Sequence, residues 1–294
     1  MDQNQTFKFS IIIPAYNEEA GIKNVIDKIK QCLKNRNYQY EIIAVNDNSK
    51  DETASILKSY PDIQTIHHQN NKGYGASLKT GISNAKHDWI LIIDADDTYP
   101  AEAIPDLIEI AKQNKHQLII GSRNKNNNAI PIERKHAKMF LNKFASYLTG
   151  KKVHDINSGL RLFRKNIVFK YWNLFPEKFS FTSTLTMICL SHGYETKFFP
   201  ISYYKRKGKS TLKPTDFFNF LKLVTKISLF FKPIKVFVPL SIFIFLLAIM
   251  LLFSFLIGWT ESFFDATFII LCATALQTLF FGLLAEIIIY TNNK

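Results

Sequence analysis

The sequence predicts an α/β domain with a mainly parallel sheet, followed by an apolar region that spans a membrane. Over residues 7–200, short apolar runs alternate with segments of helical periodicity, a rhythm typical of a parallel sheet covered on both faces. Farther along, residues 236–259 carry no charged side chain, and a second uncharged stretch covers residues 266–285. These two observations divide the chain into a globular part and a membrane part.

The elements of the globular part follow one another in a regular order. Residues 7–13 (FKFSIII) are rich in aromatic and β-branched side chains, which favours a strand, and residues 18–34 place apolar residues at helical spacing. The alternation continues with strands expected at 41–45, 63–67, 88–94 and 117–121 and helices at 51–58, 73–85 and 101–113. In such a sheet, ligands bind beyond the carboxyl ends of the strands, so the residues after each strand are candidates for a site.

Polar clusters follow three of the expected strands, at residues 14–19, 46–51 and 94–97. Each of these residues taken alone could be a turn former or a helix cap. The pair Asp94 and Asp96 is harder to explain in that way, because alternate residues of an extended chain point in the same direction, about 7 Å apart. Two such carboxylates predict a site for Mg²⁺ or Mn²⁺, with phosphate oxygens completing the octahedron.

The composition restricts the classes of protein to which the chain can belong. Of its 294 residues, 47% are hydrophobic and 21% are charged, which excludes a chain that is disordered throughout. The net charge of +13 predicts an anionic partner, such as a nucleic acid, an anionic membrane surface or a phosphorylated substrate. The three cysteines lie far apart, which excludes a disulfide-rich scaffold. No signal-peptide core follows the polar residues 1–8.

The apolar region predicts two transmembrane helices joined by a short acidic hairpin. A helix over residues 236–259 spans roughly 36 Å, enough for the hydrocarbon core, although a pair of buried helices in a soluble protein is the alternative. Residues 205–235 contain nine Lys and Arg against one acidic residue, so the positive-inside rule places the N-terminal α/β domain and the C-terminus in the cytoplasm. Residues 215–232 are basic, Phe-rich and amphipathic, which predicts a helix in the membrane interface, with an ordinary domain helix as the alternative.

The expected regions are therefore an α/β domain at 1–212, a juxtamembrane helix at 213–233 and a transmembrane hairpin at 234–294. The excess of basic residues concentrates beside the membrane, and no nucleic-acid motif accompanies it. We therefore expect a membrane partner and no nucleic-acid partner, and an oligomer is possible.

Several segments of the first region occur in a recognisable order: IIIPAYNEE, VNDNSKDET, NKGYGASLKTGI and IIDADDTYP. They resemble the successive motifs of the family 2 glycosyltransferases with the GT-A nucleotide-sugar fold. The later segments GSR (121–123), DINSGLRLFRK (155–165), FSFTSTLTM (179–187) and YYKRKGKS (203–210) are similar to the polyprenol-phosphate glycosyltransferases, the group that includes dolichol-phosphate mannose synthase. The resemblance covers about residues 9–212 and implies sugar transfer, with inversion, from a GDP- or UDP-linked donor to dolichyl or undecaprenyl phosphate.

The resemblance also implies a role for individual residues. The nucleotide base and ribose would be bound by Pro14, Tyr16, Glu18 and Asp47. A Mg²⁺ or Mn²⁺ that bridges the donor diphosphate would be held by Asp94 and Asp96, and Arg206 and Lys209 would belong to a basic loop over the donor phosphates. The acceptor phosphate would contact Arg123 and Arg134, and the sugar and acceptor pocket would be shaped by Asp155, Ser158 and Gly159.

The chain departs from the family pattern at three positions. Asn46 replaces the usual acidic residue, Thr98 stands where relatives often carry Gln, and Thr184 lies where a carboxylate base is expected in relatives that glycosylate a hydroxyl. A phosphate-monoester acceptor needs no such base, because with a second pKa of about 6 it is largely dianionic at pH 7. The absence of a Gln-x-x-Arg-Trp segment argues against a polysaccharide polymerase.

Two alternatives remain open at this stage. One is a glycosyltransferase that acts on another lipid or glycan acceptor. The other is a membrane-tethered binding module without catalytic activity, which a test of metal-dependent donor hydrolysis would separate from an enzyme.

Overall fold

The computed structural model describes residues 6–123, 132–178, 180–204, 232–259 and 265–292, together with residues 225 and 229. Within these ranges, residues 132–138, 290 and 292 are described by their backbone alone. The chain forms two units, one from Met1–Ser146 and Lys151–Leu223 and the other from Tyr147–Gly150 and Val224–Lys294. The expected interfacial helix over residues 215–232 lies almost wholly outside the described residues, and the expected domain boundaries stay predictions.

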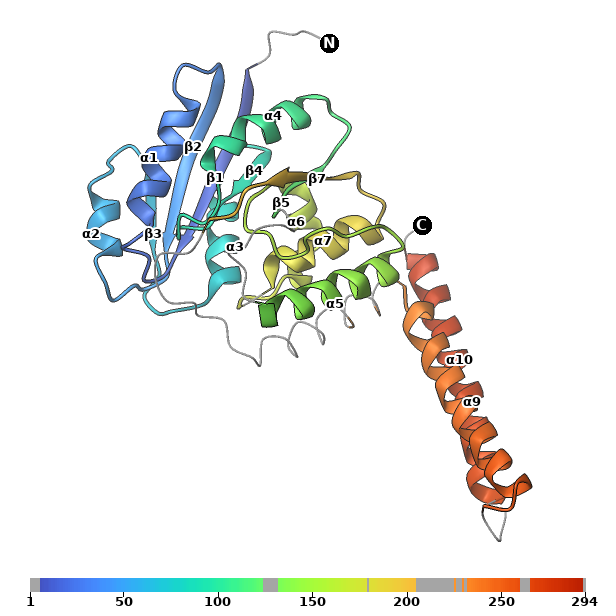
Figure 1. The fold of residues 1–294 in the computed structure, drawn as a ribbon. Coiled ribbons are helices and arrows are strands. Elements are labelled where there is room, and N and C mark those ends of the chain that lie inside the picture. The colour runs from blue at the N-terminus through green and yellow to red at the C-terminus, as the bar shows by residue number, and fades with distance from the viewer. Residues whose placement is uncertain are drawn as a thin grey trace. The chain divides into compact units, whose positions relative to one another are not determined.

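In the part of the chain that the structure describes, the first unit is built on one seven-stranded sheet with the order β3-β2-β1-β4-β6-β5-β7 (Figure 1). The strands are β1 (Phe7–Ala15), β2 (Tyr38–Asn46), β3 (Gln64–His67), β4 (Trp89–Ile92), β5 (Leu118–Arg123), β6 (Arg161–Arg164) and β7 (Thr196–Ile201). Strand β6 runs antiparallel to both β4 and β5, and every other neighbouring pair is parallel. The mainly parallel sheet that the sequence predicts is therefore confirmed, with one reversed strand inserted into it.

Helices connect most of these strands. They are α1 (Ile22–Leu33), α2 (Thr53–Lys58), α3 (Tyr74–Asn84), α4 (Ile104–Lys112), α5 (Ile132–Thr149), α6 (Lys165–Lys170) and α7 (Phe181–Ser191), with short 3-10 turns at Ala101–Ala103 and Trp172–Leu174. Each strand and helix that the sequence predicts up to residue 121 is present. The strand–helix rhythm changes after β5, because α5 leads into the reversed strand β6.

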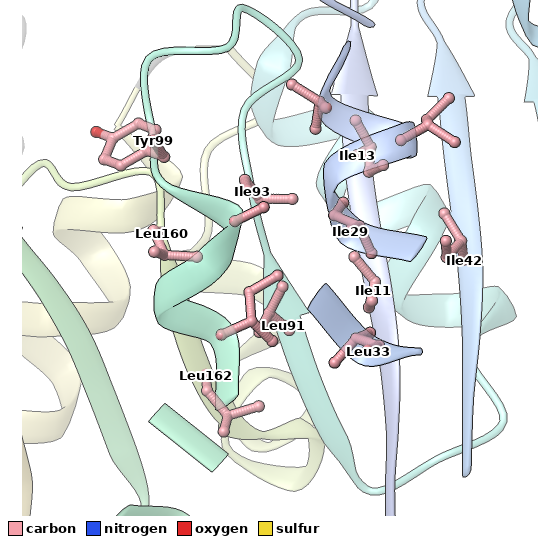
Figure 2. Packing of buried hydrophobic residues seen from close by; sticks show 14 of the residues in the cluster. Ile11, Ile13, Ile29, Leu33, Ile42, Leu91, Ile93, Tyr99, Leu160 and Leu162 are labelled. Carbon is pink, nitrogen blue, oxygen red and sulfur yellow. The ribbon is translucent and has the colours of Figure 1, made fainter. Parts of the chain in front are cut away.

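An apolar core lies between one face of the sheet and helices α1 and α4 (Figure 2). Ile11 and Ile13 of β1 pack there with Ile29 of α1, and all three side chains are fully buried. On the opposite face α3 lies so close that a Cβ atom at Gly81 would approach Ile12 Cδ1 to 3.3 Å. Because helices cover both faces, the central strands read as continuous apolar runs, and polar groups appear where these strands end.

The second unit contains two long apolar helices, α9 (Ile234–Leu256) and α10 (Asp265–Asn292). Both are long and apolar enough to cross a membrane, with mean hydropathies of 3.0 and 2.2, and most of their apolar surface is exposed. Ser241 Oγ donates a hydrogen bond to the Ala275 carbonyl at 2.7 Å, and a Cβ atom at Gly282 would lie 2.6 Å from Phe237 Cβ. The absence of a side chain at Gly282 thus allows the helix pair to pack closely.

The same unit includes the last turn of α5. Lys235 Nζ donates to the Tyr147 carbonyl at 2.6 Å, and Lys232 Nζ donates to the Thr149 carbonyl at 3.1 Å. Two cations that directly precede or begin α9 therefore satisfy carbonyl groups at the C-terminus of α5, where the helix dipole favours positive charge.

Candidate functional site

The carboxylates of Asp94 and Asp96 lie in the loop that follows strand β4. Tyr74 donates its phenolic proton to Asp94 Oδ1 at 2.9 Å. Asp96 Oδ1 accepts hydrogen bonds from Thr98 Oγ1 at 2.6 Å and from the Thr98 N–H at 3.2 Å. The neighbouring Asp97 has a left-handed φ of 58° and forms an ion pair with Lys28 at 2.6 Å. These contacts assign Asp97 a separate partner and fix the two alternating carboxylates in place.

Two glycines make the position of this loop possible. A Cβ atom at Gly159 would overlap the Asp94 carboxylate, lying only 2.5 Å from its Cγ. A Cβ atom at Gly21, just before α1, would lie 2.5 Å from the Ala95 carbonyl oxygen and 2.9 Å from Asp96 Cα. Real Cβ atoms do not approach other atoms so closely, so both positions require glycine for the loop to keep this path.

The electrostatics of the pair suit a divalent cation. Burial and the charge of Asp96 raise the pKa of Asp94, and the hydrogen bond from Tyr74 and the positive charges of Arg123 and Arg161 oppose that rise. A cation between two carboxylates would relieve the repulsion. Among the described residues no three His, Cys, Asp or Glu side chains are arranged to hold a metal ion. A metal here would take Asp94 and Asp96 from the protein and its other ligands from a phosphate or from water.

Arg123 and Asp155 meet in a bidentate ion pair. Arg123 Nε donates to Asp155 Oδ2 at 2.7 Å, and its Nη2 donates to Oδ1 at 2.8 Å. The Arg123 guanidinium also lies over the ring of Tyr203 at 5.2 Å, and the Asp155 side chain is fully buried. The two residues, which the sequence analysis assigns to the acceptor phosphate and to the pocket, are thus brought together, and each orients the other.

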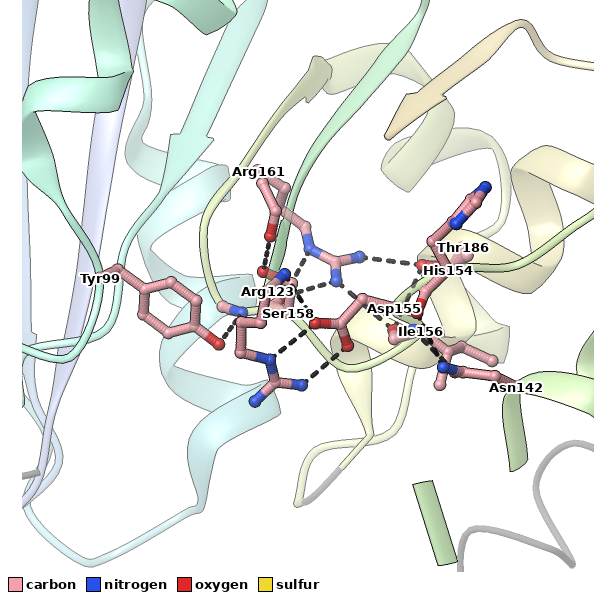
Figure 3. A network of polar contacts seen from close by, with 11 residues as sticks. Tyr99, Arg123, Asn142, His154, Asp155, Ile156, Ser158, Arg161 and Thr186 are labelled. Atoms are coloured by element: carbon pink, nitrogen blue, oxygen red, sulfur yellow. Dashed lines mark hydrogen bonds and ion pairs between the residues drawn. The ribbon is translucent and has the colours of Figure 1, made fainter. Parts of the chain in front are cut away.

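A buried network surrounds this pair (Figure 3). Ser158 Oγ donates to the Gly121 carbonyl, and the Gly159 N–H donates to the Tyr99 hydroxyl at 2.7 Å. Arg161, which is fully buried in strand β6, donates to backbone carbonyls of the same loop. The loop 155–159 therefore carries all three pocket residues expected from the sequence, and it is bonded to β5, to Tyr99 and to β6.

At the carboxyl end of β2, the side chain of Asp47 is occupied by contacts within the protein. Its Oδ1 accepts the Lys72 N–H at 2.8 Å and lies 2.7 Å from His68 Nδ1, and its Oδ2 accepts the Gly73 N–H at 2.7 Å. In the described structure Asp47 holds the loop before α3, which begins at Tyr74. Its expected contact with the nucleotide stays a prediction.

The other expected nucleotide-binding residues lie at the end of β1 or just beyond it. Pro14 is buried within the strand, Tyr16 is 37% exposed, and Glu18 is partly buried and its carbonyl accepts the N–H groups that open α1. Tyr16 thus lies partly exposed just beyond the carboxyl end of β1, where a parallel sheet binds its ligands, and its expected contact with the nucleotide stays a prediction.

The side chains of three expected basic residues, Arg134, Arg206 and Lys209, lie outside the part of the chain that the structure describes. Arg134 lies in the first turn of α5, where the structure describes only the backbone. Arg206 and Lys209 lie outside the described residues. Thr184 is buried and its hydroxyl donates to the Ser180 carbonyl at 3.0 Å.

The sequence analysis missed four residues that build the site, namely Gly21, Tyr74, Tyr99 and Arg161. One signal could have identified Arg161, because a charged residue stands between apolar neighbours in the short segment LRLF. Tyr74, Tyr99 and Gly21 carry no such signal, since their partners are distant in sequence.

Solved structures resemble this fold at low sequence identity. A crystal structure of glucosyl-3-phosphoglycerate synthase from Mycobacterium tuberculosis, in complex with Mn²⁺, UDP and phosphoglyceric acid, matches with a TM-score of 0.60 at 16% identity and covers 76% of this chain and 78% of that one. A crystal structure of TarS 1-349 from S. aureus in complex with UDP-GlcNAc matches with a TM-score of 0.56 at 20% identity and covers 75% of this chain and 66% of the other. At such identities the likeness establishes the fold, which is that of the GT-A glycosyltransferases.

Curated relatives are more similar in sequence. The undecaprenyl-phosphate 4-deoxy-4-formamido-L-arabinose transferase of Shewanella sediminis is 28% identical over 174 residues, which cover 57% of this chain and 52% of that protein. The dolichyl-phosphate beta-glucosyltransferase of Trichomonas vaginalis is 27% identical over 241 residues, which cover 76% of this chain and 71% of the relative. The chain spans about half the length of the arabinose transferases.

A family model provides the assignment. The model of glycosyl transferase family 2 matches residues 10–172, a range that contains the loop of Asp94 and Asp96, the Arg123–Asp155 pair and the glycine against the Asp94 carboxylate. Because this match covers more than half of the chain, the protein belongs to glycosyl transferase family 2.

Proposed function

We propose that this protein transfers a sugar from a GDP- or UDP-linked donor to a polyprenyl phosphate at the cytoplasmic face of a membrane, with inversion at the anomeric carbon. The observation that carries the proposal is the cluster after β4 and β5. There the Asp94–Asp96 carboxylates stand at the strand ends, and the loop of the Arg123–Asp155 pair rests against Asp94. The names of the relatives support it, since one acts on undecaprenyl phosphate and another on dolichyl phosphate.

Asp94 and Asp96 would hold the donor through a divalent cation. Held by these two carboxylates, a Mg²⁺ or Mn²⁺ would supply positive charge to stabilise the leaving diphosphate. Tyr74 keeps the Asp94 carboxylate oriented and Thr98 does the same for Asp96, so the ligands need little rearrangement when the donor binds. The nucleoside would be bound at the ends of β1 and β2 by Tyr16, Pro14, Glu18 and Asp47. The donor phosphates would be contacted by Arg206 and Lys209.

The acceptor side favours a nucleophile that is already charged. Asp155 forms a bidentate pair with Arg123, which makes it a poor proton acceptor, and Thr184 offers a hydroxyl where a carboxylate base would be needed. A phosphate monoester brings its own negative oxygen. That oxygen would form the new bond to the anomeric carbon as the bond to the diphosphate breaks, and no proton has to be removed.

Arg123 can bind the acceptor phosphate while it stays paired with Asp155. The ion pair uses Nε and Nη2, and no hydrogen bond of Nη1 is found among the described residues. Asp155 holds the guanidinium plane fixed, and Arg134 at the start of α5 would supply a second positive charge. A fixed guanidinium is suited to bind a phosphate oxygen in one orientation.

The membrane helices fit a lipid acceptor whose tail stays in the bilayer. Helices α9 and α10 would anchor the chain, and the basic stretch that precedes α9 would lie on the cytoplasmic side. Helix α5 adds an exposed face with Met139 and Phe140, beside the basic Lys143. Exposed aromatic and basic side chains on one helix suit the interfacial region of an anionic membrane.

The test is an acceptor and donor panel with the full-length protein in vesicles. Labelled GDP- and UDP-sugars would be incubated with undecaprenyl phosphate, dolichyl phosphate, diacylglycerol or a soluble sugar, in the presence of Mg²⁺ or Mn²⁺. We expect label in the lipid extract with a polyprenyl phosphate and none when EDTA is added. Transfer to diacylglycerol or to a soluble hydroxyl, with none to a polyprenyl phosphate, would contradict the proposal.

A further inference from the structure

Arg161 is a buried cation that the expected mechanism does not use. It lies in the central strand β6, opposite Ile92 of β4 and Ile120 of β5, and its exposure is 0%. Within the described residues it has no acidic partner in an ion pair. The charges of Asp94 and Asp155 act on Arg161 without an ion pair among the described residues. A buried guanidinium in that position costs several kcal/mol unless hydrogen bonds replace its hydration.

The guanidinium is instead satisfied by neutral acceptors from two segments (Figure 3). Its Nε donates to the Ser158 carbonyl at 3.0 Å, and its Nη2 donates to that carbonyl and to the Ile156 carbonyl. Its Nη1 donates to the Thr182 carbonyl at 2.6 Å and to Thr186 Oγ1 at 3.1 Å. Arg161 thus joins the loop 155–159 to the first turns of α7.

The loop that Arg161 holds is the one that touches the reacting parts of the site. It presents Asp155 to Arg123, and its Gly159 lies against the Asp94 carboxylate. Further bonds fix its other side: Ser158 Oγ donates to the Gly121 carbonyl, and the Ile156 N–H donates to Asn142 Oδ1 at 3.3 Å. A displacement of the carbonyls at 156 and 158 would therefore move the acceptor-side arginine and the carboxylate expected to bind the metal at the same time.

We propose that Arg161 is a positioning residue, whose buried guanidinium sets the distance between the acceptor side of the site, at Arg123 and Asp155, and the donor side, at Asp94. Five N–H donors in one rigid plane match the acceptors from the two segments. A lysine has three donors on one nitrogen and cannot reach the loop and α7 in the same geometry. The activity part of this inference rests on the proposed function, whereas the loop geometry does not.

The test compares Arg161→Lys with a matched control, Arg164→Lys, in the full-length protein. Arg164 is in the same strand and stacks over the ring of Trp89 at 4.3 Å, remote from the loop contacts. For Arg161→Lys we expect kcat to fall about 10- to 100-fold, because small misplacements of reacting groups cost that much. The affinity for UDP or GDP in EDTA, which reports the base and ribose contacts without the metal, should stay within about twofold, because those contacts are expected on β1 and β2. Arg164→Lys should keep the wild-type kcat and the wild-type nucleotide affinity.

Hydrogen exchange gives a readout that is independent of activity. In Arg161→Lys the amides of residues 155–159 and 181–186 should exchange faster, while those of β1 and β2 should not, and Arg164→Lys should match the wild type. If the wild-type protein transfers no sugar in the acceptor panel, the proposed function fails. The exchange data still test whether Arg161 holds the loop 155–159 to α7.

A second variant covers the case in which Arg161→Lys does not fold. Thr186→Val removes one acceptor of the guanidinium and keeps the size of the side chain, so a smaller fall in kcat and faster exchange in residues 155–159 are expected. Unchanged kcat and unchanged exchange in a folded Arg161→Lys, or in Thr186→Val if the first variant is unfolded, would overturn the inference. An equal loss of kcat and of the affinity for UDP or GDP in EDTA would also overturn it, because that pattern indicates general structural damage.

Discussion

At the scale of single residues, the Asp94 carboxylate shows how tightly the site is built. Its Oδ1 accepts a hydrogen bond from the Tyr74 hydroxyl, and Gly159 lies against the carboxylate. Asp96 is buried and its Oδ1 accepts two hydrogen bonds from Thr98. The two side chains are therefore preorganised, which is the condition for a carboxylate that serves in catalysis rather than in a surface turn.

The first prediction concerns these carboxylates. Asp94→Asn or Asp96→Asn should lower turnover at least about 100-fold, because loss of a charged ligand should cost more than the loss of an outer-shell contact. Steady-state transfer rates at saturating Mn²⁺, with circular dichroism to establish the fold, provide the measurement. Near-normal rates for both variants in the presence of EDTA would show that the expected metal site is wrong.

The second prediction concerns the glycine against Asp94. Gly159→Ala should destabilise the protein by about 1–3 kcal/mol and also reduce transfer, because the added methyl group must displace the Asp94 carboxylate. Denaturant unfolding and transfer rates should be measured together. Gly193→Ala is the control, since its φ of +74° carries backbone strain but nothing lies within 4 Å of the added atom. The control should lose some stability and keep its activity, and the same result for Gly159→Ala would contradict the contact with Asp94.

At the scale of elements, the loops after β1 and β2 are joined to each other by side chains. Asp51 Oδ2 accepts the Glu19 N–H at 3.1 Å, and its Oδ1 accepts both the N–H and the hydroxyl of Thr53, the first residue of α2. Partial burial alone would raise the pKa of Asp51, but the hydrogen bonds from Thr53 and Glu19 outweigh it, so that the pKa is lowered. The loops after β1 and β2 are thus joined through an ionised carboxylate.

The third prediction follows from the sign of that shift. A folded-state pKa below the unfolded value of roughly 3.9 means that Asp51 contributes stability above that pH and loses it as the pH falls through the folded-state pKa. Asp51→Ala should therefore lower the free energy of unfolding by about 1 kcal/mol at pH 7. The difference in free energy of unfolding between the variant and the wild type should narrow below about pH 4. Urea unfolding across pH measures it. Replacement of the exposed Asp106 in the first turn of α4 serves as the control, and a gap that does not depend on pH would contradict the assignment.

At the scale of the whole molecule, the residues expected to bind the donor and the helices expected to enter the membrane belong to different units. The strand-end residues on β1, β2 and β4 all lie in the first unit, and α9 and α10 lie in the second. Each unit has its own packing, an α/β core in one and a close pair of apolar helices in the other. We therefore expect the two properties to be separable.

The fourth prediction tests that separation. A chain that ends at residue 233 should bind UDP or GDP with Mn²⁺ as well as the full-length protein, because no strand-end group is removed. It should be released from membranes by high salt, whereas the full-length protein should stay in the membrane fraction in alkaline carbonate. Calorimetry and sedimentation provide the two measurements. A truncated protein that is folded but does not bind nucleotide would show that the second unit contributes to the donor site.

Much of the fold could be read from local patterns. The apolar runs at 7–13 and 88–94 predict strands, the stripe in α1 predicts its buried face, and the uncharged stretches predict α9 and α10, because burial in a sheet, a helix pair or a bilayer imposes a period or a length on the chain. The order of the motifs predicts the family, which the family model confirms. The roles of Asp94, Asp96, Arg123 and Asp155 follow from that resemblance and stay predictions.

Other features depended on contacts between distant segments. Strand β6 reverses the sheet after α5, and this reversal brings Arg161 between β4 and β5 and places Gly159 on Asp94. The pairing of Arg123 with Asp155 and the binding of Asp47 to the loop before α3 likewise join groups that are far apart in sequence. Hydrophobic periodicity is a local property that each segment carries in its own residues. The partners that satisfy a buried charge are known only when the strands have taken their order, and so the tertiary structure alone decided them.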